Sequence, residues 1–145
     1  MTDESTIDKR VGEAIELALA ARSRAYSPYS DFPMGAAVVD EAGRTVSGAL
    51  VENVSLGLAM CAERVALFSA VNGRVKPVVL ALASRRTGDE LTFPCGACLQ
   101  VALELAGEEL LVVAVDPDGV SDRVRLGDLI TRGPQRHHFE PDDRG

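Results

Sequence analysis

The three cysteines of the chain stand where two helices are expected to begin, and this placement constrains the fold more than any other feature. Cys95 and Cys98 lie in the segment PCGAC, at the start of an apolar helical pattern. Two thiols at positions i and i+3 of a turn entering a helix can point at one metal ion. A third ligand must come from elsewhere, and Cys61, which starts another helical pattern, is the only other cysteine. A shared metal ion therefore requires the two helix starts to lie together.

The metal that suits such a set of thiols is zinc. Three protein ligands leave one position of a tetrahedral zinc site open, which is typical of a catalytic rather than a structural site. Three thiolates give the site a net negative charge, which two helix N-termini and the guanidinium of Arg64 offset in part. Glu63 follows Cys61 too closely to be a comfortable fourth ligand, but it can exchange protons with water at the metal.

Each half of this pattern has a simpler interpretation when it is taken alone. A single cysteine at a helix start is often a small buried apolar residue, and a single C-x-x-C can be a redox pair. The joint pattern is more specific, because C-A-E followed by P-C-x-x-C matches the zinc deaminase signature in an all-cysteine form.

Three helices are predicted from apolar periodicity. The first has one apolar stripe, with Ser5 or Thr6 as its cap; the stripe comprises Val11, Ala14, Ile15, Ala18 and Leu19. The segment SLGLAMCAERVALFSAV is predicted to run helically to Asn72 and Gly73, and CLQVALELAG forms a helix that ends at Gly107.

Four strands are predicted between and around these helices. MGAAVVD and TVSGALVE form two short strands around the turn EAGR. PVVLALAS and LLVVAV are continuously apolar, as expected of strands covered on both faces, and the turn DPDG stops the second. Strands and helices alternate after residue 60, which predicts an α/β layer structure whose adjacent buried strands can be parallel.

Length, composition and charge limit the kinds of partner. The chain has 145 residues, 46% of them apolar, and a formal charge of −7. We expect one domain over residues 1–134, a polar tail over residues 135–145, and a small soluble substrate rather than nucleic acid. No run reaches the roughly 18 apolar residues needed to span a bilayer, and the N-terminus lacks the pattern of a signal peptide. We therefore expect no membrane partner and a cytoplasmic location, where the thiols stay reduced.

With these residues identified, the chain resembles the small homotetrameric cytidine deaminases. The similarity runs from AYSPYSDFPMGAAVV through VENVSLGLAMCAERVALFSAV to FPCGACLQVALEL. The resemblance implies a three-layer α/β/α fold with a central five-stranded mixed sheet. It also implies one zinc ion per subunit and a homotetramer in which neighbouring subunits complete each active site.

The resemblance assigns roles by position. Cys61, Cys95 and Cys98 match the zinc ligands, and Glu63 matches the residue that shuttles protons. Arg64 matches an arginine that hydrogen-bonds to the ligand thiolates. The implied reaction is zinc-dependent hydrolytic deamination of cytidine or deoxycytidine in pyrimidine salvage, with Glu63 acting first as base and then as acid.

Substrate contacts are implied in the same way. Phe32 matches an aromatic residue that lines the pyrimidine pocket, and Glu52 matches a carboxylate that accepts a hydrogen bond from the ribose 3′-hydroxyl. Backbone groups of Ala62 and Cys95 would contact the edge of the base.

The chain departs from the family pattern at several positions. Leu50 replaces the usual Asn, Leu56 replaces a Tyr, and Leu99 replaces the Arg that follows the second cysteine of C-x-x-C. The C-terminus lacks the usual Leu-Leu-Pro segment, so that Phe139 would be a shifted lid and His137 and His138 an exposed pair in the tail. These changes indicate an altered sugar pocket or subunit contact.

Three other functions remain as alternatives. The altered pocket would suit a modified cytosine nucleoside such as blasticidin S. A zinc-binding interaction module without activity is less favoured, because a structural site normally recruits a fourth protein ligand. Deamination of a base within nucleic acid is disfavoured by the acidic charge.

Overall fold

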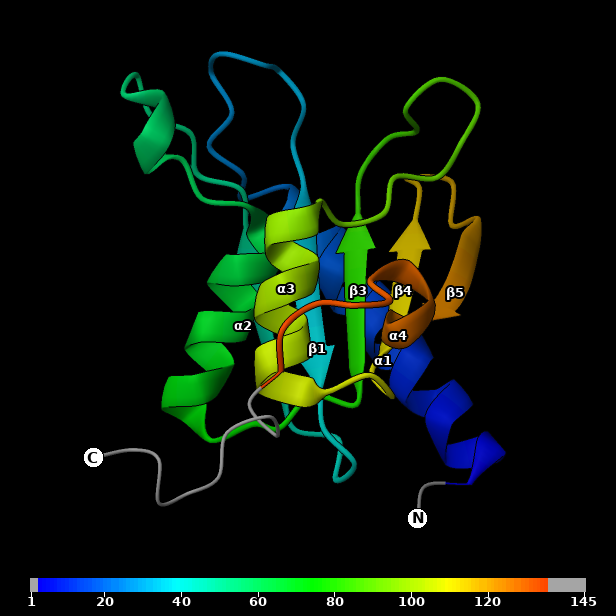
Figure 1. The fold of residues 1–145 in the computed structure, drawn as a ribbon. Coiled ribbons are helices and arrows are strands. Elements are labelled where there is room, and N and C mark those ends of the chain that lie inside the picture. Colours follow the sequence, from blue (N-terminus) through cyan, green and yellow to red (C-terminus); the bar gives the residue numbers. More distant parts are fainter. Residues whose placement is uncertain (1–2, 136–145) are drawn as a thin grey trace, which may run out of the picture.

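A five-stranded mixed sheet forms the centre of the structure, a computed structural model that describes residues 3–135 (Figure 1). The strand order is β2-β1-β3-β4-β5. The strands are β1 (Gly35–Val39), β2 (Thr45–Ala49), β3 (Val79–Ala83), β4 (Leu111–Val115) and β5 (Ser121–Arg125). β3 and β4 are parallel, as their buried apolar sequences predicted, and the other pairs are antiparallel.

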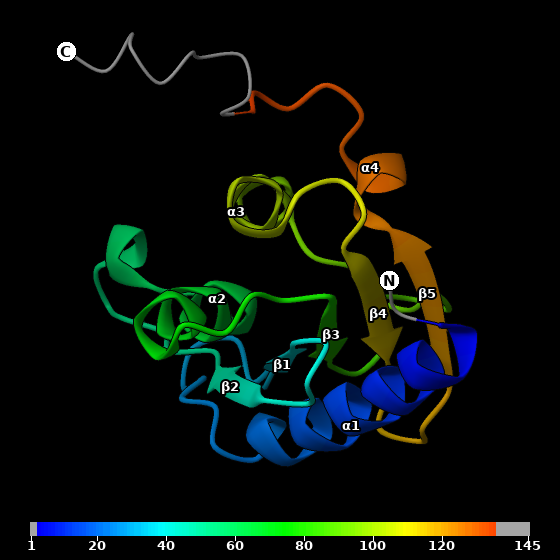
Figure 2. The ribbon, with the colours of Figure 1, turned by 90° about the horizontal axis from the view of Figure 1, so that it is seen from below.

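Helices cover both faces of the sheet, as the view in Figure 2 shows. α1 (Glu4–Arg22) packs on one face, while α2 (Ala62–Gly73) and α3 (Gly96–Ala106) pack on the other, with the short α4 (Leu126–Leu129) beside α3. Alternate residues of the strands separate the two cores, since Ala37 and Val39 face α1 whereas Ala36 and Val38 pack with α2 and α3. The expected three-layer α/β/α fold is confirmed.

The fifth strand was not found from the sequence pattern. β5 has the sequence SDRVR and three exposed residues, so it lacks the apolar alternation that marks a strand. Among residues 3–135 it is an edge strand that pairs only with β4, and Arg123 joins it to α1 through an ion pair with Asp8 at 2.7 Å. Charged side chains are common on such edges.

Two predictions about helix starts are wrong. α1 is capped by Asp3 and not by Ser5 or Thr6, because the Asp3 carboxylate accepts a hydrogen bond of 2.7 Å from the amide of Thr6. The segment SLGLAM is not α-helical and holds only a short 3-10 turn at Leu56–Leu58. Met60 exchanges two backbone hydrogen bonds with Val51, which keeps it extended and delays the helix until Ala62.

The structure does not describe the C-terminal residues for which the sequence analysis makes predictions. His137, His138 and Phe139 lie outside the described residues, as does the rest of the expected tail beyond Gln135. Within residues 3–135, the structure contains no helix with the length and apolar character that crossing a membrane requires.

A glycine on β2 allows α2 to lie close to the sheet. A Cβ atom at Gly48 would lie 2.6 Å from the amide nitrogen of Ala66 and 2.9 Å from the carbonyl oxygen of Ala62, both in the backbone of α2. Side chains cannot approach backbone atoms so closely, and a rigid helix cannot move aside as a flexible side chain does. Gly48 therefore fixes the distance between β2 and the helix that Cys61 begins.

We expect Gly48→Ala to destabilise the protein by about 1–3 kcal/mol, the usual range for an overpacked site. Gly12→Ala is the matched control, since a Cβ there meets open space on an exposed turn of α1. It should stabilise the helix by about 0.5–1 kcal/mol. Urea unfolding of both variants measures the difference, and equal stability of Gly48→Ala and the wild type would contradict the close packing.

Candidate metal centre

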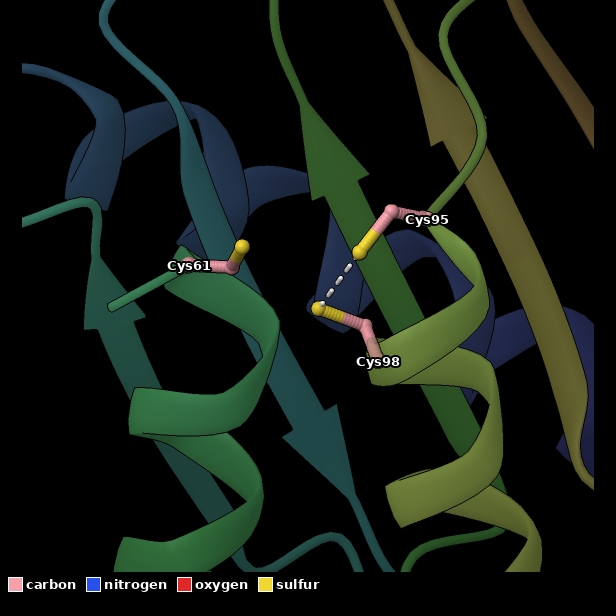
Figure 3. A group of neighbouring side chains, drawn as sticks. All are labelled: Cys61, Cys95 and Cys98. Atoms are coloured by element: carbon pink, nitrogen blue, oxygen red, sulfur yellow. Dashed lines mark hydrogen bonds between the residues drawn. The ribbon is translucent and has the colours of Figure 1, made fainter. Parts of the chain in front are cut away.

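The three cysteines meet between the starts of two helices. Cys61 is the N-cap residue of α2, Cys95 is the N-cap residue of α3, and Cys98 lies in the first turn of α3. Figure 3 shows their side chains around the space between the two helices, and their sulfur atoms all lie within 4.8 Å of one another. The Sγ atoms of Cys95 and Cys98 are 3.6 Å apart. Sulfurs at the corners of a zinc tetrahedron with bonds of about 2.3 Å lie about 3.8 Å apart, so the cluster fits zinc.

The surroundings favour ionised sulfur at Cys61. Arg64 donates a hydrogen bond of 3.3 Å from Nη2 to the Cys61 sulfur, and the N-terminus of α2 adds positive potential. The hydrogen bond from Cys98 lowers the pKa of the Cys61 thiol to about 5, with help from Arg64 and against the effect of burial. The pKa of Cys98 is raised, because it shares its proton with Cys61 and is buried. A divalent cation among the three sulfurs would deprotonate them all.

Glu63 brings a carboxyl group into the interior beside this cluster. It is 2% exposed, and its Oε1 atom has no hydrogen-bond partner among residues 3–135. Burial, with a smaller contribution from the charge of Cys61, raises the pKa of the carboxyl to about 7. A zinc ion nearby would oppose this rise through its charge. A buried carboxyl oxygen without a partner is unfavourable, and it is suited to exchange a proton with a small molecule that enters the site.

The proposed substrate contacts come from loops at the same end of the sheet. The Oε1 atom of Glu52 accepts hydrogen bonds from the amides of Tyr29 (3.0 Å) and Ser30 (3.2 Å), which fixes its carboxylate. The hydrogen bonds to Ser30 and Tyr29 together lower the pKa of Glu52 and outweigh the opposing effect of burial, so the group is ionised near neutral pH. Both amides bind Oε1, so Oε2 is the carboxylate oxygen that would accept a hydroxyl.

Backbone pairing connects these loops to Cys61. The amide of Leu50 binds the carbonyl of Met34, and Val51 pairs with Met60, the residue before Cys61. Ala62 is buried as the first residue of α2, where helix geometry leaves an amide without an intrahelical acceptor. Leu99, in contrast, is a core residue that packs with α2, so its side chain contributes to stability rather than to the site.

The sequence analysis missed one residue that contacts this region. Arg85, two residues after β3, lies with its guanidinium carbon 4.7 Å from the centre of the Phe32 ring and binds the carbonyl of Asp31. No signal in the sequence marks it, because its partners lie more than 50 positions earlier. A cavity of about 490 Å³ lies near the end of β1 and the start of β3, lined by Asp40, Arg44 and Lys76 among others, and so away from the cysteines.

Comparisons with known proteins agree with this geometry. Residues 9–114 match the family model described as cytidine and deoxycytidylate deaminase zinc-binding region. A cytidine deaminase of Mycobacterium tuberculosis is 45% identical over 116 residues, which cover 78% of this chain and 80% of the relative. A cytidine deaminase of Halalkalibacterium halodurans is 39% identical, with 80% and 87% covered. The crystal structure of a cytidine deaminase from Burkholderia pseudomallei aligns with a TM-score of 0.78 and 40% identity, covering 85% of this chain and 98% of that one.

We expect Cys98→Ala to abolish tight zinc binding, because one of three converging thiols is lost. Metal analysis should find one zinc ion per wild-type chain and only a trace in the variant. A chelator should lower the Tm of the wild type, since zinc stabilises only the folded state, and should leave the Tm of Cys98→Ala unchanged. A zinc content in Cys98→Ala equal to that of the wild type would rule out the cysteine cluster as the metal site.

Proposed function

The chain belongs to the family of zinc-dependent cytidine and deoxycytidylate deaminases, and on this premise we propose that it hydrolyses cytidine or deoxycytidine to uridine or deoxyuridine. Ammonia is the second product. The observation that carries the proposal is the position of Glu63, a buried carboxyl whose Oε1 atom has no hydrogen-bond partner among the described residues, beside three sulfurs that fit zinc. A site of this composition provides both a metal and a proton carrier to a polar substrate.

In the proposed mechanism, Cys61, Cys95 and Cys98 hold the metal, and Arg64 orients Cys61 by its hydrogen bond to sulfur. Zinc bound there would act as a Lewis acid that makes water nucleophilic near neutral pH. Glu63 accepts one proton from the attacking water and delivers it to ring nitrogen N3; it then accepts the second proton from the new hydroxyl group at C4 and delivers it to the leaving amine as the bond between C4 and that amine breaks. Each proton that Glu63 takes up is returned in the same turnover, so the residue ends the reaction in its original state.

The residues around the metal centre would hold the nucleoside. The Phe32 ring packs against the pyrimidine, and the Oε2 atom of Glu52 accepts a hydrogen bond from the 3′-hydroxyl. The amide of Ala62 and the backbone of Cys95 bind the edge of the base. Leu50 has no side-chain amide to bind the sugar, which loses a hydrogen bond worth about 0.5–1.5 kcal/mol. For this reason a modified cytosine nucleoside such as blasticidin S is the second candidate substrate.

We place the reaction in pyrimidine salvage in the cytoplasm, where reducing conditions keep three thiols available to a metal. We also propose a homotetramer in which neighbouring subunits complete the sites. Exposed apolar side chains support this, since Val54, Leu56 and Leu58 are 70–83% exposed on the segment that leads to Cys61. Such a cluster is unfavourable in water and is typical of a surface covered by another chain.

We expect Glu63→Gln to keep its zinc but to lose about 10²–10⁴-fold in kcat, because glutamine has the same shape and cannot carry a proton. The loss of cytidine absorbance gives the rate, and metal analysis gives the zinc content of both proteins. A Glu63→Gln variant with near wild-type kcat would contradict the proton role and would favour a zinc site without this chemistry.

The same assay identifies the substrate. Cytidine, deoxycytidine, blasticidin S and free cytosine are compared for ammonia release by the wild type. Turnover of cytidine or deoxycytidine with the largest kcat/KM supports the first proposal, whereas selective turnover of blasticidin S replaces it with the second. A zinc-containing protein that releases ammonia from none of the four would be an interaction module.

We expect Leu58→Asp to weaken the tetramer, because it places a charge in the surface that the neighbouring chain would cover. Light scattering should show a smaller mass than for the wild type, and kcat/KM should fall at the protein concentrations where dissociation occurs. Val120→Asp is the control, since Val120 is also exposed but lies in the turn before β5. Unchanged mass and activity in Leu58→Asp would exclude this surface from the assembly.

A further inference from the structure

Arg85 joins two segments that are distant in the sequence. Its Nη2 atom donates a hydrogen bond of 2.7 Å to the carbonyl oxygen of Asp31, and its guanidinium carbon lies 4.7 Å from the centre of the Phe32 ring. This distance is within the range of a cation–π interaction. One side chain thus holds both the backbone and the ring of two adjacent residues in the loop between α1 and β1.

The sheet places this contact at the end that carries the metal centre. Gly35, at the start of β1, pairs with Ala83, at the end of β3. Phe32 precedes β1 by a few residues and Arg85 closely follows β3. The antiparallel pairing of β1 and β3 therefore brings both residues to the same end of the sheet. The chain then continues from Arg85 to Cys95, and Figure 1 shows the loop before β1 and the loop after β3 at the end where α2 and α3 begin.

The loop over residues 27–33 is held from two sides by charged residues. Glu52 accepts the amides of Tyr29 and Ser30, whereas Arg85 binds the carbonyl of Asp31. Asp31 has a φ of +52°, a conformation that residues other than glycine rarely adopt. External hydrogen bonds of this kind keep a loop in such a conformation, and the side chain of the next residue, Phe32, takes its direction from it.

We propose that Arg85 is a positioning residue that fixes the Phe32 ring for contact with the pyrimidine base, and so sets the affinity of the site for its substrate. The proposal rests on the proposed function, in which Phe32 contacts the base. The planar guanidinium stacks on one face of the ring and donates to Asp31 at the same time, which a lysine ammonium cannot reproduce fully. The base would contact a part of the ring that Arg85 does not cover.

Steady-state kinetics with cytidine tests this role. We expect Arg85→Ala to raise KM roughly tenfold, through the loss of a cation–π contact and a charge-assisted hydrogen bond, while kcat stays within about twofold. Arg85→Lys should restore part of the loss, because a cation over the ring is kept. Calorimetry should show weaker binding of uridine to Arg85→Ala, with zinc content and Tm as in the wild type.

Arg86→Ala is the matched control. Arg86 is the adjacent exposed arginine, but its guanidinium binds the Asp116 carboxylate at 2.9 Å and the carbonyl of Asp89 at 2.7 Å. The Arg86→Ala substitution should leave the KM for cytidine unchanged. An equal increase of KM in Arg86→Ala and Arg85→Ala would mean that any loosening of this loop raises KM. That result overturns the proposal.

A double-mutant cycle tests whether Arg85 acts through Phe32. In a Phe32→Leu background, Arg85→Ala should raise KM by about twofold or less, because the ring that it orients is gone. An undiminished effect in that background overturns the proposal, as does a fall in kcat at unchanged KM. If the wild type turns over cytidine normally and Arg85→Ala has the same KM as the wild type, the role of Arg85 is overturned while the proposed function stands. Absence of cytidine turnover by the wild type overturns the proposed function and this role with it.

Discussion

The packing of two helices on one face of a mixed sheet, with their N-termini at the same end of the strands, is the constraint on which the site depends. The sulfurs lie within 4.8 Å of one another although they come from two separate helices. Their separation is therefore set by how α2 and α3 rest on the sheet and not by a local loop. Gly48 contributes to this directly, because its missing side chain lets the backbone of α2 lie close to β2. A metal site built in this way is as rigid as the core beneath it.

The ionisable side chains of the site lower the stability of the fold. A carboxyl group, three thiols and a guanidinium share a partly buried space, and burial disfavours the ionised form of Glu63 and opposes, without outweighing, the ionisation of Cys61. The N-termini of α2 and α3 and the contact from Arg64 to Cys61 offset part of this penalty. A metal ion bound by the thiolates would offset more, so binding and folding are linked. The reactive arrangement persists because the surrounding apolar core holds it in place.

The sequence predicted those parts whose signal is local. β3 and β4 are continuous apolar runs, and the C-x-x-C spacing together with Cys61 indicates a metal cluster from the sequence alone. β5 gave no such signal, because an exposed edge strand needs few apolar residues. The helical pattern of SLGLAM was misleading, since pairing between Val51 and Met60 overrides it. Arg85 could not be identified because its contacts depend on the register of β1 against β3, which appears only in the folded chain.

The residues of the site lie on two kinds of element, helices and loops. The cysteine cluster and Glu63 lie on helices fixed by the core, whereas the residues expected at the sugar and the base lie in loops held by hydrogen bonds to the side chains of Glu52 and Arg85. Loop residues change with less disturbance to the core than helix residues do. The departures at Leu50 and Leu56 follow this division, since both positions lie outside the α-helices that begin next to Cys61 and Cys95. Substrate preference can therefore shift in this fold while its deamination chemistry stays the same.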